Sequence, residues 1–457
     1  MADLEGSAPT GLDWIPQIPI EYAYEAPSLV YWGKYHPYTF TNWRDESRSW
    51  KENCYLHAGL SIGIVTSSVK GPDADKFLSA YSVSDFTTMK PYRARHIIMC
   101  ADNGNIIQDG MAIKLAENEY RCYDIAPYVE YLAETSGMDV TVENITDKMF
   151  IFQLGGPRSL EVLEHAAKQD LHDLRFMRLC DAKIAGHDVQ VLRMGMCGTL
   201  GYEVHGTIDA SHDVYNELVE AGKPYDLHKL GTLVYVSNHT ENGIAQQPAH
   251  FIEAWKDDEG FAKWAEDHFG IWFSPLAEVP TGTYTDNIED VFKTPYELNW
   301  GKMVNFNHEF KGKAALEKVR DSHHRELVTL SWNDDDIIDV YRSQFDDGPT
   351  YKQIEQPLNY GDAGPMGNLC PAYRVEAPGG KVIGQSMWRV YTEFYHKFVS
   401  LGIIDPEYTE MGTELTVIWG EADGPQKKMR VTVDRYPYLD LPSNKDFDIE
   451  SIPHYQG

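Results

Sequence analysis

The stretch VLRMGMCGTLGYEVHG, residues 191–206, combines a glycine pattern with a carboxylate in a way that could do chemistry. Gly195, Gly198 and Gly201 are spaced like a phosphate-binding loop, which needs a helix behind it so that the phosphates meet the helix N-terminus. Both flanks, DVQVLRM and YEVHGTI, alternate like strands instead. The stretch therefore predicts a strand–loop–strand hairpin and excludes a phosphate site.

Glu203 is the carboxylate that follows these glycines, on the second predicted strand. A carboxylate accepts two parallel N–H bonds from a planar edge. An arginine side chain offers such an edge, and the pterin ring of a folate offers one through N3–H and its 2-amino group. The residues alone leave two partners open for Glu203, an internal arginine and a bound planar ring.

Composition excludes several classes of partner. The chain has 457 residues, of which 42% are hydrophobic and 12% aromatic, as in a folded protein with a large core. Its formal net charge of −30 opposes binding to nucleic-acid phosphates and to anionic membrane surfaces. No apolar run approaches the roughly eighteen residues of a membrane span, and no signal peptide is visible. We expect neither a nucleic-acid nor a membrane partner.

The six cysteines are scattered, without a C-x-x-C pair. This usage is typical of reduced thiols, so we expect a cytoplasmic protein. The sequence lacks the H-E-x-x-H, paired Cys/His, P-loop and G-x-S-x-G motifs, and it therefore predicts neither a metal site nor a serine hydrolase.

Repeated units indicate how the chain is built. SSVKGPDADKFLSAY and FQLGGPRSLEVLEHA each predict a strand, a Gly-Pro turn beginning at Gly71 or Gly156, and an amphipathic helix. EFKGKAALEKV (309–319) is a looser third copy. Residues 95–123, with Asn103-Gly104 at a turn, predict an antiparallel hairpin. Strand–helix units with hairpins between them indicate an α+β fold.

The strand-like pattern from about residue 325 onward, as in RELVTLSW and KMRVTVDRY, predicts a C-terminal β-barrel. Residues 245–275 predict a helix rich in Trp and Phe, at the surface or as a lid. The acidic stretch NDDDIID (333–339) predicts a solvated loop. We expect an aromatic-rich N-terminal arm at 1–50, the α+β region at 51–320, the barrel at 321–435 and a polar tail at 436–457.

The glycine stretch resembles the Arg-x-Gly-Tyr-Thr-Gly-Glu-x-Gly-Phe-Glu segment of the tetrahydrofolate-dependent aminomethyltransferases, the T-protein family of glycine cleavage. Further blocks follow in order between about residues 42 and 430. NGNIIQDG (103–110) resembles a Gly-Gly-x-x-Asp-Asp hairpin, and residues 287–316 and 380–404 resemble two later signatures. The resemblance implies two interleaved α/β subdomains and a C-terminal barrel in a cloverleaf arrangement, with tetrahydrofolate as the cofactor.

The resemblance also implies roles for single residues. Glu203 falls on the pterin-binding glutamate of the family, and Asp109 falls on its catalytic aspartate, which is also a cofactor contact. Gln153 is implied as a further cofactor contact. The segment LGTLVYVSNHTENG (230–243) departs from the aminomethyltransferases and resembles the bacterial tetrahydrofolate-dependent aromatic O-demethylases. There Tyr235 falls on a tyrosine near the transferred methyl group and is the expected catalytic residue.

The O-demethylase branch implies an aromatic ether as substrate. Tyr31 falls on a pocket tyrosine of that branch, and we expect His57 and Tyr235 to contact the substrate as well. The aromatic N-terminal segment is then a pocket wall, and the alternative is an arm packed on the core. Arginines that hold a benzoate carboxylate in vanillate-type enzymes align with Ile125 and Leu233. The substrate is therefore recognised differently or is a neutral ether.

The sequence thus predicts transfer of the methyl group of an aromatic methyl ether to N5 of tetrahydrofolate, by a monomer or homodimer. A methylenedioxy-bridged donor, an amine donor and a non-enzymatic folate-binding assembly factor remain alternatives. The Lys-Gly-Cys-Tyr-x-Gly-Gln motif of the assembly factors is missing. A tyrosine hydroxyl, with a pKa of about 10, matches a phenol leaving group, so Tyr235 is suited to assist the departing oxygen. The role of Asp109 in such a reaction is left open.

Overall fold

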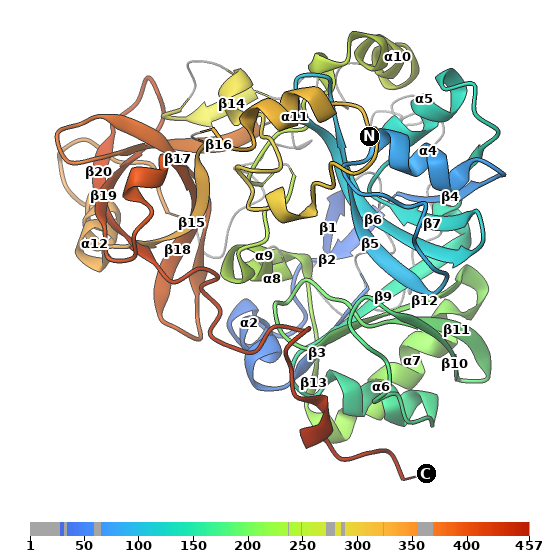
Figure 1. Ribbon diagram of the computed structural model, residues 1–457. Coiled ribbons are helices and arrows are strands. Elements are labelled where there is room, and N and C mark those ends of the chain that lie inside the picture. The colour runs from blue at the N-terminus through green and yellow to red at the C-terminus, as the bar shows by residue number, and fades with distance from the viewer. Residues whose placement is uncertain are drawn as a thin grey trace, which may run out of the picture.

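The computed structural model of the protein describes residues 28–31, 34–58, 65–235, 237–247, 249–270, 279–284, 288–322, 324–354 and 369–456. Two α/β lobes lie on one side of the molecule and a β-barrel lies on the other (Figure 1). Two short helices, α8 (Thr232–Tyr235) and α9 (Ser237–Asn242), lie between them. The predicted α+β class with a three-part arrangement is confirmed.

The first lobe is built on the sheet β5-β6-β7-β4-β8. Its strands are β4 (Thr66–Lys70), β5 (Arg93–Cys100), β6 (Ile106–Ala116), β7 (Glu119–Tyr123) and β8 (Thr141–Asn144). The helices α4 (Ala74–Tyr81), α5 (Tyr128–Thr135) and α10 (Glu259–Phe269) share one hydrophobic core with it. The glycine of the first Gly-Pro turn is required, because Gly71 has φ +139° and a Cβ there would lie 2.4 Å from the carbonyl oxygen of Asp139.

The second lobe is built on the sheet β10-β11-β12-β9-β3-β13. Its strands are β3 (Cys54–His57), β9 (Met149–Gly155), β10 (Leu179–Ile184), β11 (His187–Leu192), β12 (Gly201–Thr207) and β13 (Leu227–Lys229). The helices α6 (Ser159–Ala167) and α7 (Ser211–Gly222) pack on one face. Since β3 precedes the first lobe and β9 follows it, the two lobes are interleaved in sequence. The glycine stretch forms the predicted hairpin between β11 and β12.

The two faces of the second sheet differ in character because side chains alternate along each strand. Phe152 on β9 and Val204 on β12 point into the core under α6 and α7. Their neighbours on the opposite face include Ile151, which packs with Tyr123 of the first lobe. This inner face, where the two lobes meet, also receives the polar residues of the glycine hairpin.

The barrel is closed by pairing of β16 with β19, in the order β14-β16-β17-β18-β15-β20-β19. Its strands are β14 (Val279–Gly282), β15 (Glu326–Trp332), β16 (Leu369–Glu376), β17 (Val382–Thr392), β18 (Lys397–Ile404), β19 (Glu414–Trp419) and β20 (Lys427–Asp434). The helix α11 (Lys313–Val319) lies between β14 and β15 in the chain. Two more elements, β1 (Ser28–Tyr31) and β2 (Lys34–Pro37), form a separate hairpin, and α2 (Trp43–Glu52) follows them.

The acidic stretch at 333–339 is not the predicted loop, since it forms most of the helix α12 (Asp334–Arg342). Asn333 caps this helix by accepting a hydrogen bond from the backbone N–H of Asp336. Acidic residues in a first turn favour a helix, because its N-terminus carries positive dipole charge. Ile337 and Val340 then fix the helix on the barrel core.

The helix predicted over 245–275 is largely wrong, because α10 covers only Glu259–Phe269 and residues 271–278 lie outside the described part. The apolar residues before α10 are buried as an irregular segment whose backbone bonds to other segments. The N–H of Ala254 donates to the carbonyl of Ile106 at 2.8 Å. Tertiary hydrogen bonds thus replaced the helical ones.

The C-terminal segment after the barrel runs back to the second lobe (Figure 1). Although its sequence predicts a polar tail, Ile452 belongs to the core under α6 and α7. Asn444 accepts a hydrogen bond from Arg193 and donates one to the carbonyl of Gly201 at 2.8 Å. The segment therefore braces the glycine hairpin. Within the part of the chain that the structure describes, no helix has both the length and the hydropathy to cross a bilayer.

Candidate active site

Three of the predicted site residues form one row across the inner face of the second sheet. Gln153 on β9 is paired with Glu203 on β12 and, on its other side, with His57 on β3. Directly paired residues of antiparallel strands project to the same face, so these side chains are neighbours. All three are almost completely buried. The register of the sheet therefore assembles the row.

Tyr235 joins this row through its aromatic ring. The phenol lies on the His57 imidazole with 4.0 Å between ring centroids and 10° between planes. His57 Nδ1 lies 2.9 Å from the carbonyl oxygen of Leu230, which can only accept, so Nδ1 carries a proton. Tyr235 lies in a short helix, α8, and not in a strand. Burial, together with the charge of Glu203, raises the pKa of Tyr235 well above its usual value, so its hydroxyl stays protonated.

Glu203 is held by neutral donors and not by an arginine. The Tyr123 hydroxyl donates to Glu203 Oε2 at 3.0 Å, and His205 Nε2 donates to the same oxygen at 3.1 Å. Burial lowers the pKa of His205, which keeps its ring neutral. No arginine forms an ion pair with Glu203, and Oε1 accepts no hydrogen bond, within the described residues. The buried Arg121 lies near enough for its charge to interact with that of Glu203, but it forms no ion pair with it, so Oε1 is left for a bound ligand.

Gln153 offers the complementary group beside this acceptor. Its Oε1 accepts the hydroxyl of Tyr55 at 2.6 Å. Its Nε2 is fully buried and makes no hydrogen bond of standard geometry with a described residue, although the amide lies close enough to Tyr235 to interact with its hydroxyl. An unmet buried donor costs about 1–3 kcal/mol, which a ligand acceptor would recover. A carboxylate acceptor next to an amide donor matches a pterin edge, where N3–H and the 2-amino group lie beside the C4 carbonyl. The residues present therefore fit the implied folate.

Asp109 lies apart from the row, on β6 of the first lobe. His96 Nε2 is 2.7 Å from its Oδ2, and the His96 ring meets Trp300 edge-on at 4.8 Å. No hydrogen bond joins Asp109 to Glu203 or Tyr235 within the described part of the chain. The partner His96 escaped the sequence analysis, because strand pairing between β5 and β6 had to be known before the two could be matched.

A second carboxyl, Asp124, also escaped the sequence analysis. It follows β7, its backbone has φ +64°, and its exposed side chain forms no hydrogen bond with a described residue. A non-glycine residue in this region of backbone space marks a strained position. Surrounding protein, and then the charge of Asp109, raise the pKa of Asp124 to about 7 although the side chain remains accessible. Its charge acts in turn on Tyr123 and Tyr235.

The helix α9 adds polar groups beside Tyr235. Asn238 is fully buried, and neither its side-chain oxygen nor its nitrogen has a partner among the described residues. His239 meets Tyr235 edge-on at 5.5 Å, and burial lowers its pKa to about 4. An ion pair of 2.5 Å between Lys51 and Glu241, both buried, fastens α9 to α2. The sequence analysis singled out the segment 230–243, which contains three of these residues, but it assigned a role only to Tyr235 within it.

The structure does not test the substrate contact that the sequence predicts at Tyr31. Tyr31 is paired with Lys34 in the hairpin β1–β2, and its side chain lies outside the described residues. The aromatic residues before Ser28 lie outside them too. The pocket wall at this end of the chain therefore stays a prediction.

Comparison with known proteins identifies the family. A family model described as the GCVT N-terminal domain matches residues 18–248. The chain belongs to the GCVT family. It is 39% identical over 422 residues to a sesamin methylene transferase of Sinomonas sp. (strain No.22), covering 91% of this chain and 93% of the relative. It is 33% identical over 409 residues to a syringate O-demethylase of Sphingobium sp. (strain NBRC 103272 / SYK-6), covering 86% of each.

A solved structure agrees with the fold of this GCVT-family protein. The glycine cleavage system aminomethyltransferase T from Bartonella henselae superposes with a TM-score of 0.66. The match covers 92% of this chain and 96% of the other at 18% identity, so it supports the fold alone. The resemblance to the T-protein superfamily, near the aromatic O-demethylases, is confirmed by these comparisons.

Proposed function

We propose that this GCVT-family protein transfers the methyl group of an aromatic methyl ether to N5 of tetrahydrofolate. The observation that carries the proposal is the row of Glu203, Gln153 and His57 with Tyr235 stacked at its end. It combines a site for a planar heterocycle with a phenol suited to an aryl–oxygen leaving group. The similarity to a syringate O-demethylase over most of the chain supports the same reaction.

Bound tetrahydrofolate would supply a neutral amine nucleophile at N5. The carbon–oxygen bond of the ether breaks, an N5–carbon bond forms, N5 loses its proton and the aryl oxygen gains one. Glu203 and Gln153 would hold the pterin edge and so align N5 with the methyl carbon. Alignment of this kind can contribute several kcal/mol to catalysis.

In this proposal Tyr235 acts at the aryl oxygen, and Asp124 acts at the N5 proton. Because Tyr235 remains protonated, it acts as a hydrogen-bond donor to the departing aryl oxygen. Asp124, with a pKa of about 7, exchanges a proton readily near neutral pH and is the proposed acceptor of the N5 proton. Asp109, paired with His96, then serves to raise the pKa of Asp124.

Charge distribution favours a neutral aromatic substrate. Arg121 is buried on β7 and donates to the side chain of Gln190, and Arg44 forms an ion pair with Glu393. The aligned positions Ile125 and Leu233 are buried and apolar. Tyr31 remains a proposed substrate contact, and Tyr31→Ala should raise the KM for the ether more than it weakens folate binding.

A methylenedioxy-bridged aromatic is the second candidate donor. The similarity to a sesamin methylene transferase over 91% of this chain favours it. The bridge carbon would then leave both oxygens, giving a catechol, while two folate nitrogens lose their protons. The same row and the same phenol serve this reaction, since it too needs alignment and a protonated aryl oxygen.

A substrate panel tests the proposal. The protein is incubated with tetrahydrofolate and, separately, with methoxy-aromatics, methylenedioxy-aromatics and N-methylated amines, and the folate products are separated by chromatography. We expect 5-methyltetrahydrofolate from a methoxy-aromatic, or 5,10-methylenetetrahydrofolate from a methylenedioxy-aromatic. Product formed only from amines would contradict the proposal.

We also propose a cytoplasmic location, with no nucleic-acid or membrane partner. The five cysteines whose side chains the structure describes carry free thiols, which agrees with a reducing compartment. Whether the protein is a monomer or a homodimer stays a prediction for measurement by sedimentation.

A further inference from the structure

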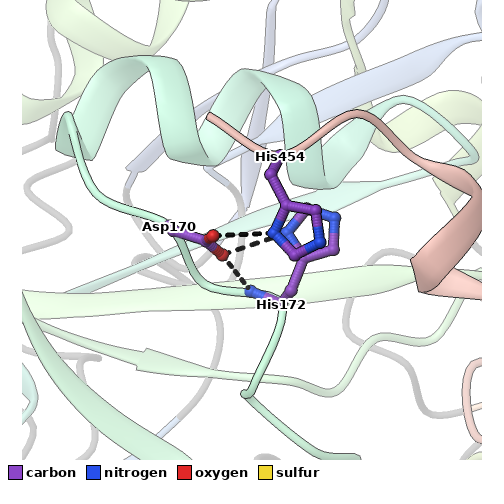
Figure 2. A group of neighbouring side chains, drawn as sticks. All are labelled: Asp170, His172 and His454. Atoms are coloured by element: carbon purple, nitrogen blue, oxygen red, sulfur yellow. Dashed lines mark hydrogen bonds and ion pairs between the residues drawn. The ribbon is translucent and has the colours of Figure 1, made fainter. Parts of the chain in front are cut away.

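Asp170, His172 and His454 form a compact cluster far from the row that contains Glu203. Asp170 and His172 follow α6, while His454 lies on the C-terminal segment, 284 positions from Asp170 (Figure 2). One ligand atom from each residue lies within 4.8 Å of the others. The sequence predicted no metal site, because no spacing motif can join residues so far apart in the chain.

The imidazole of His172 is held in place by a hydrogen bond from one ring nitrogen, as in many metal-binding histidines. Its Nε2 lies 3.1 Å from the carbonyl oxygen of Ile452, so this nitrogen carries a proton and donates. Its Nδ1 faces two carboxylates, Glu164 at 2.9 Å and Asp170 at 3.1 Å. An imidazole held by a backbone carbonyl through one nitrogen, with the other facing the metal position, is common in metal sites.

His454 brings a second imidazole to the same carboxylate. Its Nδ1 lies 2.7 Å from Asp170 Oδ2, and its ring stacks on His172 with centroids 3.8 Å apart (Figure 2). Asp170 therefore faces both imidazoles, with Oδ1 toward His172 and Oδ2 toward His454. Glu450, 3.8 Å from His454 Nε2, adds a further negative charge.

We propose that Asp170, His172 and His454 bind one divalent transition-metal ion of the Zn²⁺ type, with Glu164 as a hydrogen-bonding neighbour of His172 outside the ligand group. Two imidazole nitrogens with carboxylate oxygens suit Zn²⁺, whereas Mg²⁺ and Ca²⁺ prefer oxygen ligands alone. Tetrahedral bonds of about 2.0–2.1 Å set ligand atoms about 3.3 Å apart. The contacts of Asp170 with the two Nδ1 atoms, 3.1 and 2.7 Å, would open by a few tenths of an ångström. The His454 ring would also rotate off His172, because the lone pairs of two stacked imidazoles lie in near-parallel planes and do not meet at one ion.

The movement needed to bind the ion costs little at the His454 side chain and more at the His172 side chain. The His454 side chain is 46% exposed and lies near the end of the described chain, whereas His172 is buried. The His172 ring is surrounded by Glu164, Asp170, His454 and the Ile452 carbonyl, and Glu450 lies beside the His454 ring.

A bound ion would fasten the C-terminal segment to the second lobe. The same segment holds Gly201 through Asn444, at the start of the strand that carries Glu203. The ion is therefore a structural clamp and not part of the reaction. Its existence does not depend on the proposed one-carbon transfer.

The test uses the untagged, full-length protein after chelator treatment. Titration with ZnCl₂ at pH 7.5, followed by calorimetry and by thermal unfolding, should show one site per chain and a higher Tm. His454→Ala and Asp170→Asn should each weaken Zn²⁺ binding at least tenfold and remove the rise in Tm. His187→Ala is the matched control, because His187 forms a single histidine–carboxylate pair with Asp213 at 2.8 Å.

Two further measurements separate this site from nonspecific binding. CoCl₂ should give the visible absorption of a tetrahedral site, and MgCl₂ should leave Tm unchanged. Zn²⁺ binding that is absent, or that survives unchanged in His454→Ala, would overturn the proposal and leave the cluster as a hydrogen-bonded contact. Since His454 is an exposed residue of the C-terminal segment, its variant is expected to fold.

Discussion

The phenol ring of Tyr235 lies flat on the imidazole of His57, 4.0 Å away, and His57 is tied in turn to the carbonyl of Leu230. Leu230 directly precedes the segment that leads into α8, which carries Tyr235. The stack and the hydrogen bond therefore form a closed loop of contacts. This loop fixes the direction of the Tyr235 hydroxyl before any ligand binds.

Tyr235→Phe should keep this stack and lose only the hydroxyl. If that hydroxyl assists the departing aryl oxygen, kcat should fall at least 100-fold while KM changes little. The loss should shrink for ethers whose phenols are more acidic, because a better leaving group needs less help. Steady-state kinetics over ring-substituted ethers measure this, and equal losses throughout the series would assign Tyr235 to pocket shape alone.

His57 should act by positioning Tyr235. His57→Phe retains an aromatic partner for the phenol, whereas His57→Ala removes it, so His57→Phe should keep the larger share of kcat. Both variants leave the Leu230 carbonyl unpaired, which should cost about 1–3 kcal/mol of unfolding free energy in each. Kinetics and denaturant unfolding of the pair check this. Indistinguishable kcat values would contradict the positioning role.

Glu203 should carry much of the affinity for the pterin ring. Glu203→Gln keeps the shape but loses the charged acceptor, and tetrahydrofolate binding should weaken more than tenfold, since charge-assisted bonds contribute about 1.5–3 kcal/mol. Tyr123→Phe removes only one donor to Oε2 and should have a smaller effect. Calorimetry with each variant compares them, and unchanged folate affinity in Glu203→Gln would return Glu203 to a structural role.

Asp124 should give the reaction an inflection near neutral pH. Its pKa is raised to about 7, so the carboxylate that accepts a proton forms as the pH rises, and kcat/KM should increase through that pH. Asp124→Asn should abolish the inflection. Asp109→Asn removes one cause of the raised pKa and should move the inflection to lower pH. A profile that is unchanged in Asp124→Asn would exclude this carboxyl as the acceptor.

The raised pKa of Asp124 also predicts how the free energy of unfolding changes with pH. Folding raises the pKa of Asp124 from 3.8 to about 7, so the folded state binds the proton more tightly than the unfolded state does. This contribution to stability is full below pH 3.8 and is lost as the pH rises toward 7. Between these values Asp124→Asn should flatten the dependence of the unfolding free energy on pH.

Local pattern was sufficient for two of the elements that contain the row, β9 with Gln153 and β12 with Glu203, but not for β3 or α8. Alternation on both sides of Gly195 and Gly201 predicted the hairpin, and the two Gly-Pro units predicted β4–α4 and β9–α6. The resemblance added Glu203, Gln153 and Tyr235. What placed them together, however, is the pairing of β3, β9 and β12, which local pattern does not encode.

The features that the sequence did not reveal depend on contacts between distant segments. His96 became a partner of Asp109 through the pairing of β5 with β6. Asp124 stands out only through its backbone conformation and surroundings. The segment before α10 is apolar enough for a helix, yet it bonds to β6 at Ile106 instead. In each case the deciding interaction lies outside any window of local sequence.

The alternation along β9 limits which insertions and deletions the gene can tolerate. Inserting one residue into β9 before Phe152 would turn the Gln153 amide into the core under α6 and bring the ring of Phe152 into its place. Inserting two would restore the direction but shift the amide away from Glu203. Length changes are therefore expected to accumulate in the connecting loops, while the spacing from Met149 to Gly155 stays constant among functional variants.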